Sequence, residues 1–311
     1  MARLCEAKEL LRLPQELLVW VCLRLWPAEV VTRRLGPWQG RIRRRGNPVA
    51  VARARSALAR AFGVSEGSAE CARLLDEHYA ELGRLAVEAS VTNHLTEAEI
   101  ASQTRLLNPE LALEMAEAGP GAVLLGSHYG SRIHPSLAFH AAGLPFFEIV
   151  HRPDPPRSWL WRRGLSRHLA ALNLDPQRSS YVGESLDTVR RVRAGQIVGI
   201  AGDAPTRRGV EVTLLGSPYR LNPGFSRMHR LTGAPGLFMA PIREPDMRHR
   251  IAFEPVELVG DEQTDCAAYA QVLEAAIRSA PSGWRLWSML GMWLEKVESG
   301  TLPGVEVERA V

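Results

Sequence analysis

Short apolar runs alternate with amphipathic stretches in the second part of the chain. The apolar runs have the length of strands and lie at residues 122–125, 146–150, 197–201, 210–215 and 237–242. Stretches with a helical pattern separate them, at residues 135–142, 158–172, 185–194 and 224–231. Strands that alternate with helices predict a largely parallel sheet flanked by helices. Two closing helices are expected near residues 266–280 and 284–294.

Before residue 120 the pattern is helical. Asn47-Pro48 favours a helix start, and Thr96 with Glu99 forms a capping-box pattern. We therefore expect an α/β fold with a helical N-terminal portion and an interfacial N-terminal helix. Residues 1–45 would form a membrane-surface anchor segment. Residues 46–311 would form a single domain, with a helical part at 46–119 and an α/β core at 120–311.

The N-terminal region combines an apolar run with tryptophans and arginines. The run at residues 17–23 is too short to span a bilayer, and no small-residue cleavage site follows it. Trp20, Trp26 and Trp38 lie in the vicinity, and a basic cluster follows at Arg41, Arg43, Arg44 and Arg45. This composition is typical of a helix lying on an anionic membrane surface. The alternative is a core helix followed by a solvated basic loop.

Composition adds two constraints. All cations except Lys8 and Lys296 are arginines, and the formal net charge is +4. The guanidinium group of arginine binds phosphate and carboxylate groups bidentately, which favours phosphorylated or acidic partners. A GC-rich genome also enriches arginine. The four cysteines, at positions 5, 22, 71 and 266, show no zinc or disulfide spacing, which fits a reducing compartment. We expect no metal site and no nucleic-acid partner.

A histidine follows the first apolar run of the predicted sheet. The segment Gly126-Ser127-His128-Tyr129-Gly130 is a polar turn with glycine at both ends. The carboxyl ends of strands in open α/β sheets are where ligands bind, and the glycines would let a substrate approach the backbone. We interpret His128 as a general base. The alternative is a histidine that only caps the turn.

This turn and five further blocks resemble the late lipid A acyltransferase family, within the lysophospholipid acyltransferase superfamily. The turn, with Leu125 before it, resembles the block that carries the family's histidine. The other blocks follow the family's order and lie at residues 51–62, 150–153 (Val-His-Arg-Pro), 200–203 (Ile-Ala-Gly-Asp), 215–218 and 232–235. The resemblance extends over most of the chain.

The resemblance implies an activity and a location. Members move a fatty acyl group from acyl carrier protein or coenzyme A to a hydroxyl (or amine) of a lipid or glycolipid acceptor. The resemblance also implies a peripheral protein that carries out the transfer at the cytoplasmic side of the membrane. No metal or redox cofactor is implied, because the acyl-thioester is a co-substrate.

The chain departs from the family in two places. The family's first block places an Asp or Glu five positions after the histidine, where this chain has Ile133. The closing tryptophan region resembles Trp284-Arg285-Leu286-Trp287 but continues differently. These departures leave two alternatives open: a degenerate, non-catalytic member that binds lipid, carrier protein or a partner enzyme, and a thioesterase that uses the same pocket.

Asp203 is the carboxylate that we expect to serve His128. It follows the run at residues 197–201, so both residues would emerge at one edge of a parallel sheet. Alternatively, Asp203 caps a turn or pairs with Arg207 or Arg208.

Candidate substrate-binding residues are Tyr129, Arg132, Arg152, Arg207 and Arg208. Arg152 could hold a phosphate or an oxyanion, or form a structural salt bridge. Arg207 and Arg208 could contact a phosphopantetheine arm or an anionic headgroup, or lie in a solvated loop. Glu148 lies within a predicted strand and is a poorer catalytic candidate.

Overall fold

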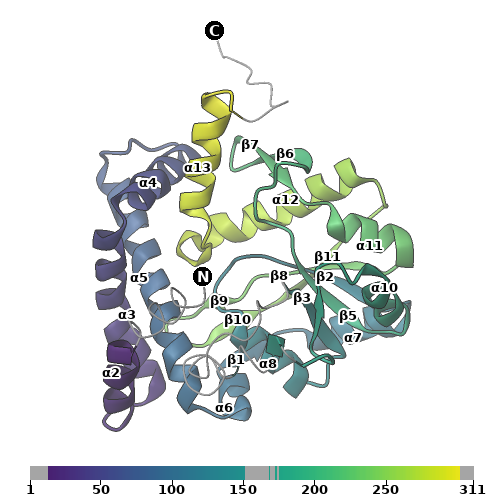
Figure 1. Ribbon diagram of the computed structural model, residues 1–311, viewed down its shortest axis with the longest axis horizontal. Helices are drawn as coiled ribbons and strands as arrows, with labels where there is room; N and C mark the ends of the chain where they lie inside the picture. Colours follow the sequence, from purple (N-terminus) through teal and green to yellow (C-terminus); the bar gives the residue numbers. More distant parts are fainter. Residues whose placement is uncertain (1–12, 151–167, 169–171, 174, 302–311) are drawn as a thin grey trace.

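The computed structural model describes residues 13–150, 168, 172–173 and 175–301 (Figure 1). The N-terminal helices form one side of the molecule, drawn in purple and blue, and the central sheet lies on the other side. These helices are α2 (Leu13–Leu23), α3 (Ala28–Gly46), α4 (Pro48–Phe62) and α5 (Ala69–Val91). The fold is α/β, as the alternating pattern predicted.

A six-stranded sheet forms the centre of the α/β part. Its strand order is β11-β8-β2-β5-β3-β4, and all pairings are parallel except that of β11 with β8. The strands are β2 (Ala122–Gly126), β3 (Phe146–Val150), β4 (Ser179–Tyr181), β5 (Ile197–Ala201), β8 (Gly236–Met239) and β11 (Phe253–Val256). This arrangement confirms the largely parallel sheet.

Strand β2 is buried on both faces, which explains its unbroken apolar sequence. Val123 and Leu125 pack into the large core shared with α12 (Glu262–Ser279) and α13 (Trp287–Glu298). Ala122 and Leu124 pack into a second core beneath α7 (Pro109–Glu117). A strand in this position presents only its carboxyl end to ligands.

The remaining elements surround this sheet. The other helices are α6 (Glu97–Ser102), α8 (Ile133–Ala141), α10 (Ser185–Arg193) and α11 (Gly224–Thr232), with short turns η1 (Thr92–His94) and η3 (Pro281–Gly283). A small sheet joins β1 (Thr104–Leu106), β10 (His249–Ile251) and β9 (Ile242–Arg243). The Thr96–Glu99 capping box at the start of α6 is present.

Three element predictions need correction. The apolar run at 210–215 forms a strand, β6 (Val210–Leu214), but it pairs with β7 (Ser217–Leu221) in a separate antiparallel hairpin. Ile242 belongs to the small sheet, because Pro241 interrupts the run that begins in β8. The last helix begins at Trp287 and not at Trp284, because η3 turns the chain first. Most of the helix expected at 158–172 lies outside the described residues.

Helices α3 and α5 approach each other at backbone contact. A Cβ atom on Gly83 would lie 2.0 Å from the Gly36 carbonyl oxygen, and one on Gly40 would lie 2.1 Å from the Tyr79 carbonyl oxygen. Only glycine permits this approach. The predicted anchor segment therefore shares an interface with the helical part that follows it.

Helix α2 has apolar side chains on two faces. Val19 and Cys22 are buried against Val87 and Val91 of α5. On the outer side, Leu17, Trp20 and Val21 are exposed, together with Leu25 and Trp26 just after the helix. Among the described residues, no helix has the length and apolar character that crossing a membrane requires.

Candidate active site

Two neighbouring strands bring His128 and Asp203 together. In the parallel pair β2–β5, Gly126 lies opposite Ala201, and each candidate residue follows two positions later in its own chain segment. Both side chains therefore emerge at the carboxyl edge of the sheet, where ligands of such sheets bind. The juxtaposition expected from the topology is present.

The contact between the two residues is direct. The imidazole Nδ1 of His128 lies 2.7 Å from Oδ1 of Asp203, and the His128 backbone N–H donates to Oδ2 at 2.7 Å. Asp203 is completely buried, whereas 37% of the His128 side chain is exposed. A carboxylate only accepts, so Nδ1 carries a proton, and in the neutral imidazole Nε2 is then the nitrogen with the lone pair.

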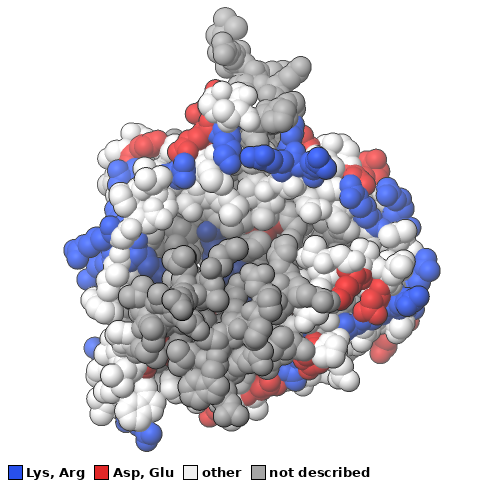
Figure 2. Space-filling view, viewed as in Figure 1, with Lys and Arg blue, Asp and Glu red and all other residues white. Residues whose placement is uncertain are grey.

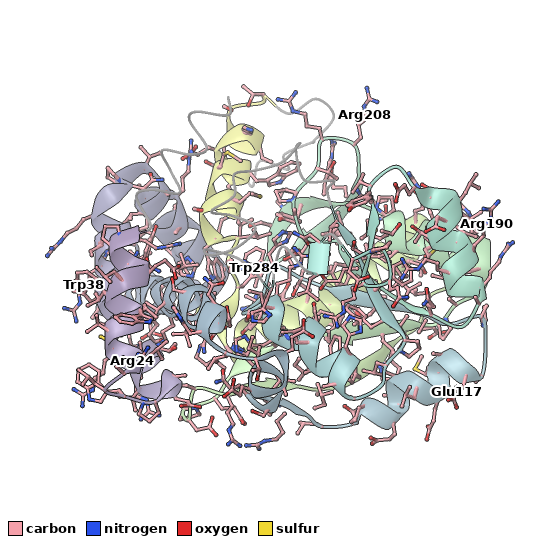
Figure 3. All side chains as sticks on the ribbon, turned by 60° about the horizontal axis from the view of Figure 1, so that its bottom comes forward. Arg24, Trp38, Glu117, Arg190, Arg208 and Trp284 are labelled. Atoms are coloured by element: carbon pink, nitrogen blue, oxygen red, sulfur yellow. The ribbon has the colours of Figure 1, made fainter. Side chains whose placement is uncertain are left out.

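Asp203 is held by aromatic side chains from distant parts of the chain. Trp284 donates from Nε1 to Oδ2 at 2.9 Å, and Tyr219 donates its hydroxyl to the Asp203 backbone oxygen at 2.7 Å. Trp284 lies in the interior of the molecule (Figure 3). Burial raises the pKa of Tyr219 well above its ordinary value, and the Asp203 charge adds to this effect. The carboxylate is thus fixed from several directions, with its imidazole contact facing the site.

Arg285 is a site residue that sequence reasoning did not assign. Its backbone N–H donates to the His128 carbonyl oxygen at 2.9 Å, and its Nε donates to the same oxygen at 3.3 Å. Burial lowers the pKa of Arg285; the charge of Asp203 opposes this, and that of Arg132 adds to it. The only sequence signal was the resemblance at Trp284-Arg285 to the family's closing region.

Tyr129, a predicted substrate-binding residue, packs against the closing segment of the chain. Its side chain is buried and its hydroxyl donates to the Ala280 carbonyl oxygen. Its backbone forms an isolated antiparallel bridge with Trp284. Gly130 follows with φ at +55°, and a Cβ there would lie 2.3 Å from the Pro241 oxygen. The turn after His128 is therefore pinned to the closing segment and leaves no room for a larger residue.

Arg132 is held by other side chains at the edge of the site. Its Nε donates to Glu148 Oε2 at 2.7 Å, and its NH2 group donates to the Asn173 side chain at 2.7 Å. Glu148, on β3, also accepts from Ser136 at 2.8 Å. The role of Glu148 in the structure is therefore to position Arg132, whose side chain is 35% exposed.

Ile133, at the position of the family's acidic residue, faces an apolar cluster. It packs with Ile100, Leu137 and Leu172 at the start of α8. An isoleucine suits this environment, and the carboxylate next to His128 comes from Asp203, which follows β5.

The remaining predicted residues lie apart from the pair. Arg207 and Arg208 are exposed in the loop between β5 and β6, and Figure 3 shows Arg208 pointing away from the molecule. The Asp203 carboxylate binds His128 and Trp284, so it does not serve as the partner of these arginines. Arg152 lies outside the described residues.

A buried histidine and carboxylate group also occurs away from this pair. Within the described part of the chain, Glu88, His134 and His249 place possible metal ligands within 4.8 Å of one another. However, the guanidinium of Arg243 lies 2.5 Å from Glu88 and also pairs with Glu81 at 2.7 Å. Burial acts to raise the pKa of Glu88, but Arg243 and the two histidines hold that pKa well below its ordinary value. Arginine thus already supplies the positive charge that a metal would bring.

Comparison with known proteins identifies the family. A search of curated proteins found no match. Residues 5–290 match the family described as bacterial lipid A biosynthesis acyltransferase. The matched region includes the strand-end histidine, Asp203 and the Trp284-Arg285 segment. The chain therefore belongs to the bacterial lipid A biosynthesis acyltransferase family.

Proposed function

We propose that this protein transfers a fatty acyl group from a thioester donor to a hydroxyl (or amine) of a lipid or glycolipid acceptor, with His128 as the general base. The observation that carries the proposal is the His128 Nδ1–Asp203 contact of 2.7 Å, which leaves Nε2 free at the exposed edge of the sheet. Family membership supports acyl transfer in lipid biosynthesis.

The geometry supports a direct transfer. Nε2 of His128 takes the proton of the acceptor hydroxyl while the acceptor oxygen bonds to the thioester carbonyl carbon. The carbon–sulfur bond then breaks, and the thiolate takes the proton back from the imidazolium. The buried Asp203 carboxylate stabilises the imidazolium that exists between these two steps. The histidine is regenerated, and the products are an ester and a free thiol.

Arginines supply positive charge near the pair. Arg285 hydrogen-bonds to the His128 carbonyl, and Arg132 is oriented by Glu148. We assign Arg285 and Arg132 to stabilising negative charge on the substrates. Arg207 and Arg208 are exposed and suit the phosphates of coenzyme A or of the phosphopantetheine arm of acyl carrier protein. Arg152 keeps its proposed role in binding a phosphate or an oxyanion.

We also propose that the protein binds the cytoplasmic membrane face peripherally. Helix α2 and the turn after it expose Leu17, Trp20, Leu25 and Trp26. The Arg24 guanidinium lies 4.9 Å from the Trp20 ring centroid, and Arg34 lies 5.9 Å from that of Trp26. Exposed apolar side chains with tryptophan and arginine favour the interface of an anionic bilayer.

The alternative of a degenerate, non-catalytic member rested on the missing acid at position 133. Asp203 removes that reason, because it supplies a carboxylate to His128 from the loop that follows β5. A thioesterase would use the same pair with water in place of the acceptor. Detection of the acylated acceptor, in addition to free thiol, distinguishes transfer from hydrolysis.

The decisive experiment compares His128→Gln with His94→Gln. His94 is an exposed histidine outside the site. Purified variants are given acyl-carrier-protein or coenzyme A thioesters together with membrane lipids, and free thiol and acylated lipid are measured. We expect His128→Gln to lose about 10²–10⁴-fold in rate and His94→Gln to keep it. Equal rates in both variants would end the general-base proposal.

A further inference from the structure

A second pocket, separate from His128, lies among α3, α4 and α5. Its volume is about 810 Å³, within the range of sites that hold small ligands. The charged residues that line it are Arg41, Arg44, Arg45, Arg55 and Asp76. None of these residues is among those that hydrogen-bond to the side chains of His128 or Asp203.

The charge of this pocket is strongly positive. Four guanidinium groups line it, and Asp76 is the single carboxylate among the lining residues. Arg44 pairs with Asp76, whereas Arg41, Arg45 and Arg55 form no salt bridge within the described part of the chain. Lys and Arg gather at this edge of the molecule, over α3 and α4 (Figure 2). Three arginines are therefore available for an anionic ligand.

The start of α4 adds to this field. Asn47 caps the helix by accepting from the Ala50 N–H, and Pro48 occupies its first turn. The amino end of a helix carries partial positive charge, which favours an anion such as phosphate. Pro48, Val51 and Ala52 of this turn line the pocket, so the helix end and the arginines act on the same space.

Exposed apolar side chains run beside the arginines. Trp38 and Ile42 precede Arg41 and Arg45 by three positions on α3, the spacing at which helix side chains are neighbours, and they are 48% and 44% exposed. Val49, beside Pro48, is 58% exposed. Figure 3 shows Trp38 at the outer side of the helices. A water-soluble anion would leave these apolar side chains exposed to solvent, whereas an amphiphilic ligand would bury them.

We propose that this pocket binds the phosphate headgroup of an anionic lipid. The guanidinium groups of the arginines would form bidentate hydrogen bonds with the phosphate, while Trp38, Ile42 and Val49 contact the lipid's apolar part. The site holds one lipid of the membrane surface and is distinct from the acceptor site at His128. Because its test measures binding alone, its failure can be told apart from failure of acyl transfer.

The test uses the full chain and two pairs of substitutions that remove the same charge. The pocket variant is Arg41→Gln with Arg45→Gln, and the control is Arg190→Gln with Arg193→Gln, two exposed arginines of α10 outside the pocket and outside the predicted anchor segment. Binding is measured to vesicles of phosphatidylcholine with and without phosphatidylglycerol. Near-surface arginines contribute about fivefold each to binding. We expect the pocket variant to lose about 25-fold on anionic vesicles and the control much less.

Arg55→Gln gives an independent check, because Arg55 lies on α4, outside the predicted anchor segment. A loss of about fivefold supports a built pocket. Equal losses in the pocket pair and the control pair, with Arg55→Gln unchanged, would reduce the arginines to general surface charge and overturn the proposal. Soluble glycerol 3-phosphate separates the possible sources. If glycerol 3-phosphate binds the pocket as tightly as anionic vesicles do, the ligand is a free phosphate compound. If the pocket variants lose affinity for acyl carrier protein and keep it for vesicles, the pocket is a protein-docking surface. Either result would reject the lipid proposal.

Discussion

Asp203 binds both the main chain and the side chain of His128. One carboxylate oxygen accepts from the His128 backbone N–H and from Trp284, and the other faces the imidazole Nδ1. The carboxylate therefore fixes the position of the turn as well as the orientation of the ring.

Asp203→Asn should abolish most acyl transfer. The amide oxygen can still accept from the backbone N–H and Trp284, which places the NH₂ group against Nδ1. The imidazole then carries its proton on Nε2 and can no longer act as a base. We expect a rate loss of about 10²–10⁴-fold, measured as thiol release. Asp187→Asn, an exposed control on α10, should keep its rate, and full activity of Asp203→Asn would contradict the assignment.

Trp284→Phe should lower kcat by about tenfold, because it removes a hydrogen bond to the carboxylate. Trp287→Phe is the matched control. It is also buried, and its Nε1 donates to the Pro281 oxygen at 2.8 Å and not to Asp203. A merely structural role predicts equal effects of the two substitutions on kcat. We expect a selective kcat loss in Trp284→Phe with KM nearly unchanged.

Ile133→Asp, which restores the family's acid, should not increase activity. The side chain at 133 packs with Ile100, Leu137 and Leu172, so a carboxylate there would enter an apolar cluster. We expect a loss of at least about 2 kcal/mol in the free energy of unfolding, measured by urea titration. Ile133→Val serves as the conservative control. Faster thiol release by the Asp variant would show that position 133 reaches His128.

Stability should fall as the pH falls from about 6.5 toward about 4. Burial lowers the pKa of His78 to about 4, against the smaller opposing effect of a hydrogen bond with the Ser282 backbone. In this window the unfolded chain binds a proton that the folded chain excludes, so acid favours unfolding by up to about 3 kcal/mol. His249, whose pKa burial also lowers to about 4, acts in the same direction.

Urea midpoints at about pH 7 and about pH 5 would check this dependence. His78→Gln should flatten it, and His94→Gln should leave it unchanged. An unaltered pH slope in His78→Gln would mean that another group dominates. Because His78 lies beneath η3, which precedes Trp284, its protonation would also disturb the segment that holds Asp203.

The exposed apolar side chains of α2 should control membrane binding. Leu17 and Trp20 are 63% and 44% exposed, and we expect Leu17→Ser with Trp20→Ser to weaken vesicle binding by at least about tenfold. Val182→Ser with Leu186→Ser removes exposed apolar side chains near α10 and serves as the control. Flotation assays would measure both. Substitution is preferable to deleting residues 1–45, because that deletion would also remove the α3 surface that α5 packs against.

The sequence predicted the central strands because each of them is short and largely apolar. Residues 122–126 are fully buried, residues 146–150 and 197–200 are buried or half-buried, and their alternation with helices determined the fold class. The edge strands β1 and β4 are three residues long and carry polar side chains, so no apolar pattern predicted them. Of the hairpin β6–β7, only β6 was predicted, because β7 contains Pro218 and alternates polar with apolar residues.

The site divides in the same way. The proximity of His128 and Asp203 followed from strand topology, since both come two residues after paired strand positions. Trp284 and Arg285 reach the pair from a turn far along the chain, which local pattern cannot place. The burial of Tyr129 was also missed, because a tyrosine next to a site histidine gives no local sign of the direction of its ring.

The glycine contacts between α3 and α5 have a mechanical consequence. Backbones that touch at Gly36, Gly40 and Gly83 leave no compressible layer of side chains in which one helix could slide or tilt against the other. A bilayer that receives the outer face of α2 and α3 would therefore hold the whole enzyme at one height and one inclination. The depth at which an acceptor must present its hydroxyl to His128 is then a fixed length of the molecule. Substrates would be selected partly by how far their reactive group stands out from the membrane.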